Sequence, residues 1–170
     1  GGNGFSNRPM SADGRFVGYS RYNPDTFGTE PYLWDRTTGA STPLFGGPQQ
    51  INAVDPVLTA DGTAAFYSTW QVAEDQAPVY DASLLRVDTA TGHIDQFPLP
   101  DAGVFPGARQ VRGIASSADG SVVALEVSDN GVPFLRREVQ VWTEAGGFDT
   151  ITDHAAIESD DVYGYELPGA

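Results

Sequence analysis

The chain has 170 residues, of which 40% are hydrophobic, 20 are glycine and 12 are proline, and it has no cysteine. Its net charge of −14 makes nucleic acids and anionic lipids poor partners, because like charges repel. The absence of cysteine excludes disulfides and thiolate metal sites. No apolar run approaches the roughly 18 residues of a membrane-spanning helix, and the glycine and proline content favours short strands joined by turns.

A four-residue turn motif recurs three times along the chain. It reads Ser-Ala-Asp-Gly at residues 11–14, Thr-Ala-Asp-Gly at 59–62 and Ser-Ala-Asp-Gly at 117–120. Asp accepts hydrogen bonds from nearby backbone N–H groups, and Gly adopts a positive φ without strain. Each copy is followed by a run of apolar and aromatic residues, at 15–20, 63–70 and 121–128. The motif therefore predicts three hairpin turns.

A second turn motif follows each of these runs. It reads Asp-Arg-Thr-Thr-Gly at 35–39 and Asp-Thr-Ala-Thr-Gly at 88–92, with a weaker form, Thr-Glu-Ala-Gly, at 143–146. Apolar segments precede it at 32–34, 84–87 and 139–142. Others follow it at 42–45, 93–99 and 148–152. The two motifs together predict three four-stranded antiparallel meanders.

The predicted strands are apolar on both faces, as residues 64–67 and 122–125 illustrate. A single sheet with two apolar faces needs a cover on each, and stacking similar sheets around an axis supplies both covers. We therefore predict an all-β fold made of β-propeller blades. Residues 1–170 form one domain in this scheme, with units at about 5–46, 51–99 and 110–152 and a tail at 153–170.

The first unit resembles the TolB-like propeller repeat, which is itself similar to the Trp-Asp repeat. The resemblance lies in residues 9–17, in Asp25-Thr26 and in residues 32–39, and it weakens toward the third unit. It implies an exported β-propeller of bacterial type that serves as a binding platform or as the accessory domain of a hydrolase. An extracellular or periplasmic location is expected on the same ground.

Three units are fewer than the four to eight blades, roughly, of a closed propeller. We expect an incomplete ring that is closed by a second copy or by a blade-bearing partner, or a piece of a larger chain. The acidic tail at 153–170 is predicted to be either an edge strand or a strap, and the sequence does not choose between them.

A meander of this kind sends its tight Asp-Gly and Thr-Gly turns to one rim, the tight-turn rim. The links predicted at 20–30, 46–54, 71–82 and 100–109 go to the other, the long-loop rim, and only Asp129 to Gly131 looks like a tight link there. Functional residues concentrate on long loops, so we predict ligand binding on that rim. The candidates are aromatic, acidic or arginine residues: Arg21, Tyr22, Asp25, Trp70, Glu74, Asp75, Tyr80 and Arg109.

Aromatic rings beside carboxylates and arginines suit a carbohydrate or a peptide. The alternative for each candidate is a ring packed under its own loop or a solvated acid. We expect no cofactor. Residues 23–30 and the tail offer oxygen atoms to Ca²⁺, but without the spacing of a calcium loop. His93 and His154 are too far apart in sequence and setting to indicate a zinc site.

No nucleophile elbow, phosphate-binding glycine loop or His-Glu-x-x-His motif occurs in the sequence. The chain alone is therefore not expected to be an enzyme. The leading hypothesis is a non-catalytic binding or assembly module that takes a protein or a carbohydrate. One alternative is a propeller segment of a larger hydrolase or polysaccharide lyase, and another is a structural subunit of an extracellular assembly.

Overall fold

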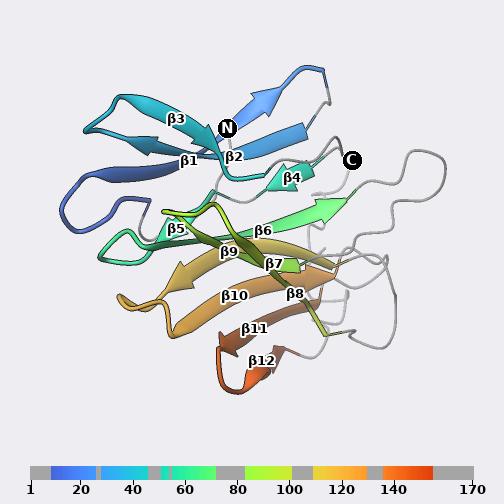
Figure 1. Ribbon diagram of the computed structural model, residues 1–170. Coiled ribbons are helices and arrows are strands. Elements are labelled where there is room, and N and C mark those ends of the chain that lie inside the picture. Colours follow the sequence, from blue (N-terminus) through green and yellow to red (C-terminus); the bar gives the residue numbers. More distant parts are fainter. Residues whose placement is uncertain are drawn as a thin grey trace, which may run out of the picture.

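The computed structural model describes residues 9–25, 28–45, 51–53, 55–71, 83–100, 109–129 and 136–154. Within these ranges every regular element is a β-strand, and none is a helix. The strands form three antiparallel groups that fan out in chain order (Figure 1). The predicted all-β fold of propeller blades is confirmed.

The strands fall into three units. The first holds β1 (Phe16–Asn23), β2 (Gly28–Asp35) and β3 (Ala40–Pro43), with a bridge from Met10 to Val17. The second holds β4 (Ile51–Ala53), β5 (Val57–Leu58), β6 (Ala64–Gln71), β7 (Ser83–Asp88) and β8 (Ile94–Pro98). The third holds β9 (Arg109–Ser116), β10 (Val122–Asp129), β11 (Arg136–Thr143) and β12 (Gly147–His154).

The third unit is a separate four-stranded sheet in the order β12-β11-β10-β9. The first two units are joined by one parallel residue pair, Thr29 with Asn52, which connects β2 to β4. The first strand of the second unit is split, because β4 and β5 pair with different parts of β6. The sequence motifs did not predict this join or this split.

Each of the three Asp-Gly turns has the same pattern of hydrogen bonds. In the third, the Ser117 hydroxyl donates to the Asp119 carboxylate at 2.7 Å, and the backbone N–H of Val122 donates to the Ser117 hydroxyl oxygen at 3.0 Å. The same bonds recur from Ser11 and from Thr59. Gly120, at φ 74, supplies the left-handed residue that the turn requires. The recurring residues thus specify one recurring turn.

These turns also bond to each other and form a turn ladder, made of Ala12, Ala60 and Ala118. The backbone N–H of Ala12 donates to the carbonyl of Ala60 at 2.7 Å, and the N–H of Ala60 donates to the carbonyl of Ala118 at 2.7 Å. Each rung joins one unit to the next. The turn motif therefore fixes the spacing between units as well as the hairpin within each.

Two hydrophobic clusters lie between the units. On β6, Ala64 and Phe66 belong to the cluster shared with the third unit, while Ala65 and Tyr67 belong to the cluster shared with the first. Successive side chains of a strand point to opposite faces, so one strand serves both clusters. Phe66 and Tyr67 are fully buried. Both apolar faces of the middle unit are covered, as the strand pattern predicted.

One detail of the predicted turns is wrong, and another is not tested. The positive φ in the last turn is at Gly147 rather than at Gly146. Thr143 pairs with Gly147, the first residue of β12, so residues 144–146 form the loop between the two strands. The predicted tight link at Asp129 to Gly131 lies mostly outside the described residues; β10 ends at Asp129, which pairs with Arg136 at the start of β11.

Candidate functional site

The long-loop rim of the first unit is shorter than predicted. The sequence suggested a loop over 20–30, but β1 continues to Asn23 and β2 begins at Gly28. Arg21 and Tyr22 are therefore strand residues, and both are exposed, Tyr22 at 56%. Asp25 is an exposed turn residue, and the side chain of Asn23 accepts its N–H at 2.9 Å.

The strand register places two of the candidates in one row. Tyr22 is opposite Thr29, Thr29 pairs with Asn52, and Asn52 is opposite Trp70. Neighbouring strands are about 4.8 Å apart, so the backbones of Tyr22 and Trp70 are separated by about 14 Å across the sheet. The row brings together two aromatic residues that are distant in sequence, at the long-loop end of the strands.

The remaining candidates are placed less fully. For Trp70 and Arg109 the structure describes the backbone only, and Arg109 begins β9 opposite Asp129. Glu74, Asp75 and Tyr80 lie outside the described residues. Ligand binding by these five residues, as by Arg21, Tyr22 and Asp25, stays a prediction.

Glu30, the residue after Thr29 of this row, accepts hydrogen bonds from two neighbouring side chains. Its carboxylate accepts hydrogen bonds from the Asn23 amide at 2.6 Å and from the Tyr32 hydroxyl at 3.1 Å. The bond to Glu30 raises the pKa of Tyr32 above its ordinary value. Tyr32 also stacks on Tyr19, with ring centroids 5.6 Å apart. Arg21 is opposite Glu30 in the β1–β2 register, so aromatic and charged groups adjoin here.

The tight-turn rim, which the sequence predicted to be short, carries a groove of about 580 Å³ between the first and second units. Phe16, Leu33, Leu44 and Val87 form its apolar walls. Polar residues of the turns line the rest: Arg15, Asp35, Thr38, Thr42, Asp61, Thr63, Asp88 and Thr89. The sequence prediction missed this groove, because it assigned the turns only a structural role.

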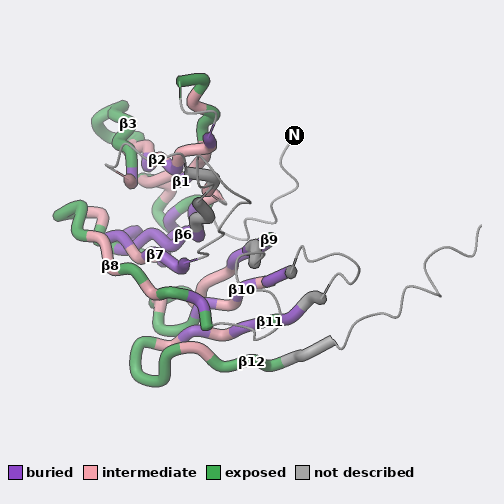
Figure 2. Tube along the Cα trace, turned by 90° about the vertical axis from the view of Figure 1, so that its right-hand side faces the viewer, coloured by how far each residue is buried: buried purple, intermediate pink, exposed green. Residues whose placement is uncertain are grey.

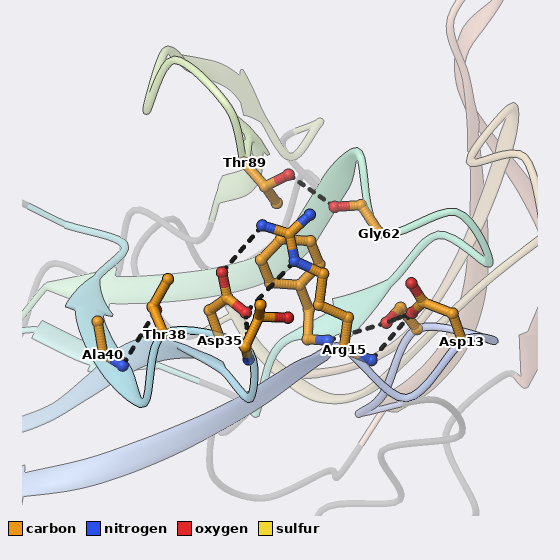
Figure 3. Close-up of polar contacts among 10 residues, drawn as sticks. Asp13, Arg15, Asp35, Thr38, Ala40, Gly62 and Thr89 are labelled. Carbon is orange, nitrogen blue, oxygen red and sulfur yellow. Dashed lines mark hydrogen bonds and ion pairs between the residues drawn. The ribbon is translucent and has the colours of Figure 1, made fainter.

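Arg15 lies beside the groove and pairs with Asp35 (Figure 3). Its Nε and Nη2 atoms donate to the two carboxylate oxygens at 3.3 and 3.0 Å, and its guanidinium is 4.5 Å from the centroid of the Phe16 ring. The hydrogen bond from Arg15 lowers the pKa of Asp35. Figure 3 also shows Thr89, which donates to the carbonyl of Gly62 and so ties two turns of the second unit together.

The other turn carboxylates are also held ionised. Hydrogen bonds from Thr63 and Thr59 lower the pKa of Asp61, and hydrogen bonds from Thr91 and Ala90 lower that of Asp88. The hydroxyl of Ser117, with Ser121, lowers the pKa of Asp119 to about 2. These acids are acceptors inside their own turns. They give the rim negative charge at neutral pH.

The described residues contain no group of three or more acidic or histidine side chains placed to hold a metal ion. His93 is exposed and lies 3.2 Å from Asp95; the side chain of His154 is not described. In the part of the chain that the structure covers, no helix has the length and apolar character of a membrane span.

No protein-family model matches the sequence, and no curated protein matches it significantly. Solved structures share its fold. An oligogalacturonate lyase in complex with manganese matches with a TM-score of 0.60 at 17% identity, over 88% of this chain and 40% of that one. Dipeptidyl peptidase 4 of Porphyromonas gingivalis gives 0.59 at 11% identity, over 85% and 25%.

A third match is the β-propeller domain of the trilobed protease from Pyrococcus furiosus, which has an open velcro topology. Its TM-score is 0.54 at 14% identity, over 84% of this chain and 41% of that one. This chain thus spans about two fifths of the length of the lyase and of the protease domain. The chain has the fold of a β-propeller segment.

Proposed function

We propose that this chain is a segment of a larger β-propeller, of the TolB-like kind, which serves a hydrolase or a polysaccharide lyase by selecting or positioning its substrate. Structural similarity to propeller-bearing lyases and peptidases supports this proposal over a free-standing binding module. The observation that carries it is a pair of sheet faces, one at each end of the fan of units, that no described residue covers as the second unit is covered.

The uncovered faces are found by comparing equivalent positions. On the side that faces the preceding unit, the second unit presents Tyr67 and Leu85, and the third presents Leu125, all 3% exposed or less. The first unit presents Tyr19 and Tyr32 there, both only partly buried. Figure 2 shows the difference, because β6 and β7 of the second unit are largely purple where they are described, while β1 and β2 are largely pink.

In the third unit the exposed face is the other one, which points away from the second unit. Val122 is 39% exposed and Val139 is 36% exposed, whereas Ala64 and Leu84, at the equivalent positions of the second unit, are 5% and 0% exposed. Apolar residues that are exposed here and buried at the equivalent positions of the second unit are expected on a face that a further blade covers. These two faces would be covered by further blades, either of a longer chain or of a second copy, and the long-loop rim would then line one mouth of the ring.

The substrate-binding role is tested on that rim. Tyr22→Ala and Trp70→Ala are expected to weaken binding of an oligogalacturonate or a mixed-sequence peptide while the circular dichroism spectrum stays unchanged. Ile151→Ala is the control, because Ile151 is 64% exposed on β12, away from the Tyr22–Trp70 row. Isothermal titration calorimetry measures the binding. Unchanged affinity in both aromatic variants would overturn the role of the rim.

The ring proposal has a separate test. At micromolar concentration the chain is expected to associate through its uncovered faces, and Tyr32→Arg or Val139→Arg is expected to reduce that association. Size-exclusion chromatography with light scattering measures the mass. A folded monomer that stays monomeric at millimolar concentration would contradict the exposed faces as blade contacts.

A further inference from the structure

The first and third units carry the same kinds of side chain in a row on their second long strand, facing the preceding unit. The row is Glu30, Tyr32 and Trp34 on β2, and Glu138, Gln140 and Trp142 on β11. In each row the middle residue donates a hydrogen bond to the glutamate, at 3.1 Å from Tyr32 and at 2.5 Å from Gln140. The two rows are therefore equivalent surfaces.

Only the row of the third unit is covered. Glu138, Gln140 and Trp142 are 8%, 1% and 2% exposed, and Trp142 shares a hydrophobic cluster with Ala64 and Phe66 of the second unit. The residues of the first row are each only partly buried, and in the described part of the chain no unit precedes the first. The covered row therefore shows what kind of surface the other row requires.

The second unit covers Trp142 with two phenyl rings. The ring centroids of Phe97 and Phe66 lie 4.7 and 6.1 Å from that of Trp142, which are distances at which aromatic rings attract each other. Ala64, two residues before Phe66, belongs to the same cluster, and its methyl group takes little of the space beside the indole. A cover for a tryptophan row thus combines one small residue with two rings.

The gap between the first and second units has the reverse combination. Its row ends in Val87, which is 1% exposed. Counted from the Asp-Gly turn, the first unit brings Phe16 to the position of Ala64 and Gly18 to that of Phe66, and Phe16 packs against the cluster that contains Val87. A ring meets a small residue in each gap, but the two sides exchange roles. A cover that suits a valine row therefore differs from one that suits a tryptophan row.

The third unit does not offer the cover that a tryptophan row requires. On its face away from the second unit, the strand register places Ala124 at the position of Phe66 and Thr152 at that of Phe97. A second copy of this chain that placed its third unit before the first would therefore bring no ring to Trp34 at either position. The missing cover has the pattern of the second unit instead.

We propose that the first unit is preceded, in the assembled propeller, by a blade of the second unit's kind. The strand of this blade that faces Trp34 carries a small residue and, two residues later, an aromatic ring, and a second ring comes from its outermost strand. This inference rests on the proposed function, because it names the partner of one uncovered face of the larger propeller. Two copies of this chain alone would close a ring in which Trp34 is poorly packed.

The test moves the two rings to the third unit of the whole chain. The double variant Ala124→Phe/Thr152→Phe is expected to self-associate at least about tenfold more tightly than the unchanged chain, since each aromatic contact adds to the binding free energy. Adding Trp34→Val is expected to remove that gain, because the rings then meet a valine row. Sedimentation velocity measures the dissociation constants, and circular dichroism checks that each variant is folded.

Val122→Phe is the matched control for added apolar surface, because it places a ring on the same face at the position of Ala64. There the ring would compete with Trp34 for space, so this variant is expected to associate no more tightly than the unchanged chain. Combined with Trp34→Val it is expected to gain, since Phe16 faces Val87 in this way. An equal gain from a ring at position 122 or 124 would overturn the proposal.

Failure of this inference differs from failure of the ring. If the double variant associated no more tightly than the unchanged chain, and the unchanged chain still associated, the partner named here would be wrong and the ring proposal would stand. If no variant associated at millimolar concentration, both would be overturned. Ala124→Phe alone, which lies on an outward face, keeps the test decisive if the double variant does not fold, with a smaller expected gain.

Discussion

Trp34 and Trp142 occupy the same position in the first and third units, and their surroundings differ. Each lies on the second long strand of its unit, one residue before the turn, on the face toward the preceding unit. Trp142 is 2% exposed because the second unit covers it, whereas Trp34 is only partly buried. The comparison teaches that the strand pattern decides which face is apolar, while the neighbouring unit decides how much that face stabilises the fold.

Substitution of the two tryptophans gives the largest expected effect. Trp142→Ala should lower the free energy of unfolding by about 4 kcal/mol, as expected for a buried aromatic residue that leaves a cavity. Trp34→Ala should cost less, about 2 kcal/mol, because part of its surface is already solvated. Urea unfolding, followed by circular dichroism at a concentration where the chain is monomeric, measures both. Equal losses would show that the uncovered face is as well packed as the covered one.

Two turn glycines extend the same comparison to a smaller effect. Gly120 has a φ of 74, and a Cβ there would lie 2.7 Å from a Thr59 methyl group of the neighbouring unit. Gly39 has a φ of 71, and a Cβ there would meet no other atom within 4 Å. Gly39→Ala should therefore cost about 1–2 kcal/mol for the backbone alone. Gly120→Ala should cost about 3 kcal/mol, because overpacking adds to that strain.

Thermal unfolding of the two glycine variants separates the cost of backbone strain from the cost of overpacking between units. The melting temperature of Gly120→Ala should fall further than that of Gly39→Ala. If the two fell equally, backbone strain alone would account for the loss, and the contact between units at Gly120 would have no energetic role.

The smallest expected effect is on the response to acid. Asp119 has a folded pKa of about 2, below its ordinary 3.8, because Ser117 and Ser121 donate hydrogen bonds to its ionised form. Its contribution to stability is therefore complete above about pH 4 and is lost as the pH falls toward 2. Asp119→Asn should flatten the decline of stability between pH 4 and 2. Urea titrations at several pH values measure the free energy of unfolding. If it declined as steeply in Asp119→Asn, protonation of Asp119 would not be a cause of the loss of stability in acid.

The repeated turns, and with them the fold, could be predicted from the sequence because the turn chemistry is local. Asp119, Gly120 and their counterparts act within five residues of chain, and three copies of one motif specify three copies of one turn. The last turn was misplaced by one residue because Gly146 and Gly147 are adjacent, and only the pairing of Thr143 with Gly147 decides between them.

The sites were harder to predict because they depend on distant pairings. The row from Tyr22 to Trp70 requires the single parallel pair of Thr29 and Asn52, which no local pattern encodes. A loop was predicted at 20–30, yet residues 20–23 and 28–30 are paired in β1 and β2. The groove escaped prediction because its lining residues come from two units, and only the folded chain brings them together.

The turn ladder of Ala12, Ala60 and Ala118 also gives the molecule a polarity. Both rungs run the same way, with the N–H of the earlier unit donating to the carbonyl of the later one. Any further unit must join head to tail, because a reversed unit would set donor against donor or acceptor against acceptor. Head-to-tail addition has only two outcomes, a closed ring or an open-ended filament. The angle between units therefore decides whether such a repeat stays soluble as a ring or grows without limit.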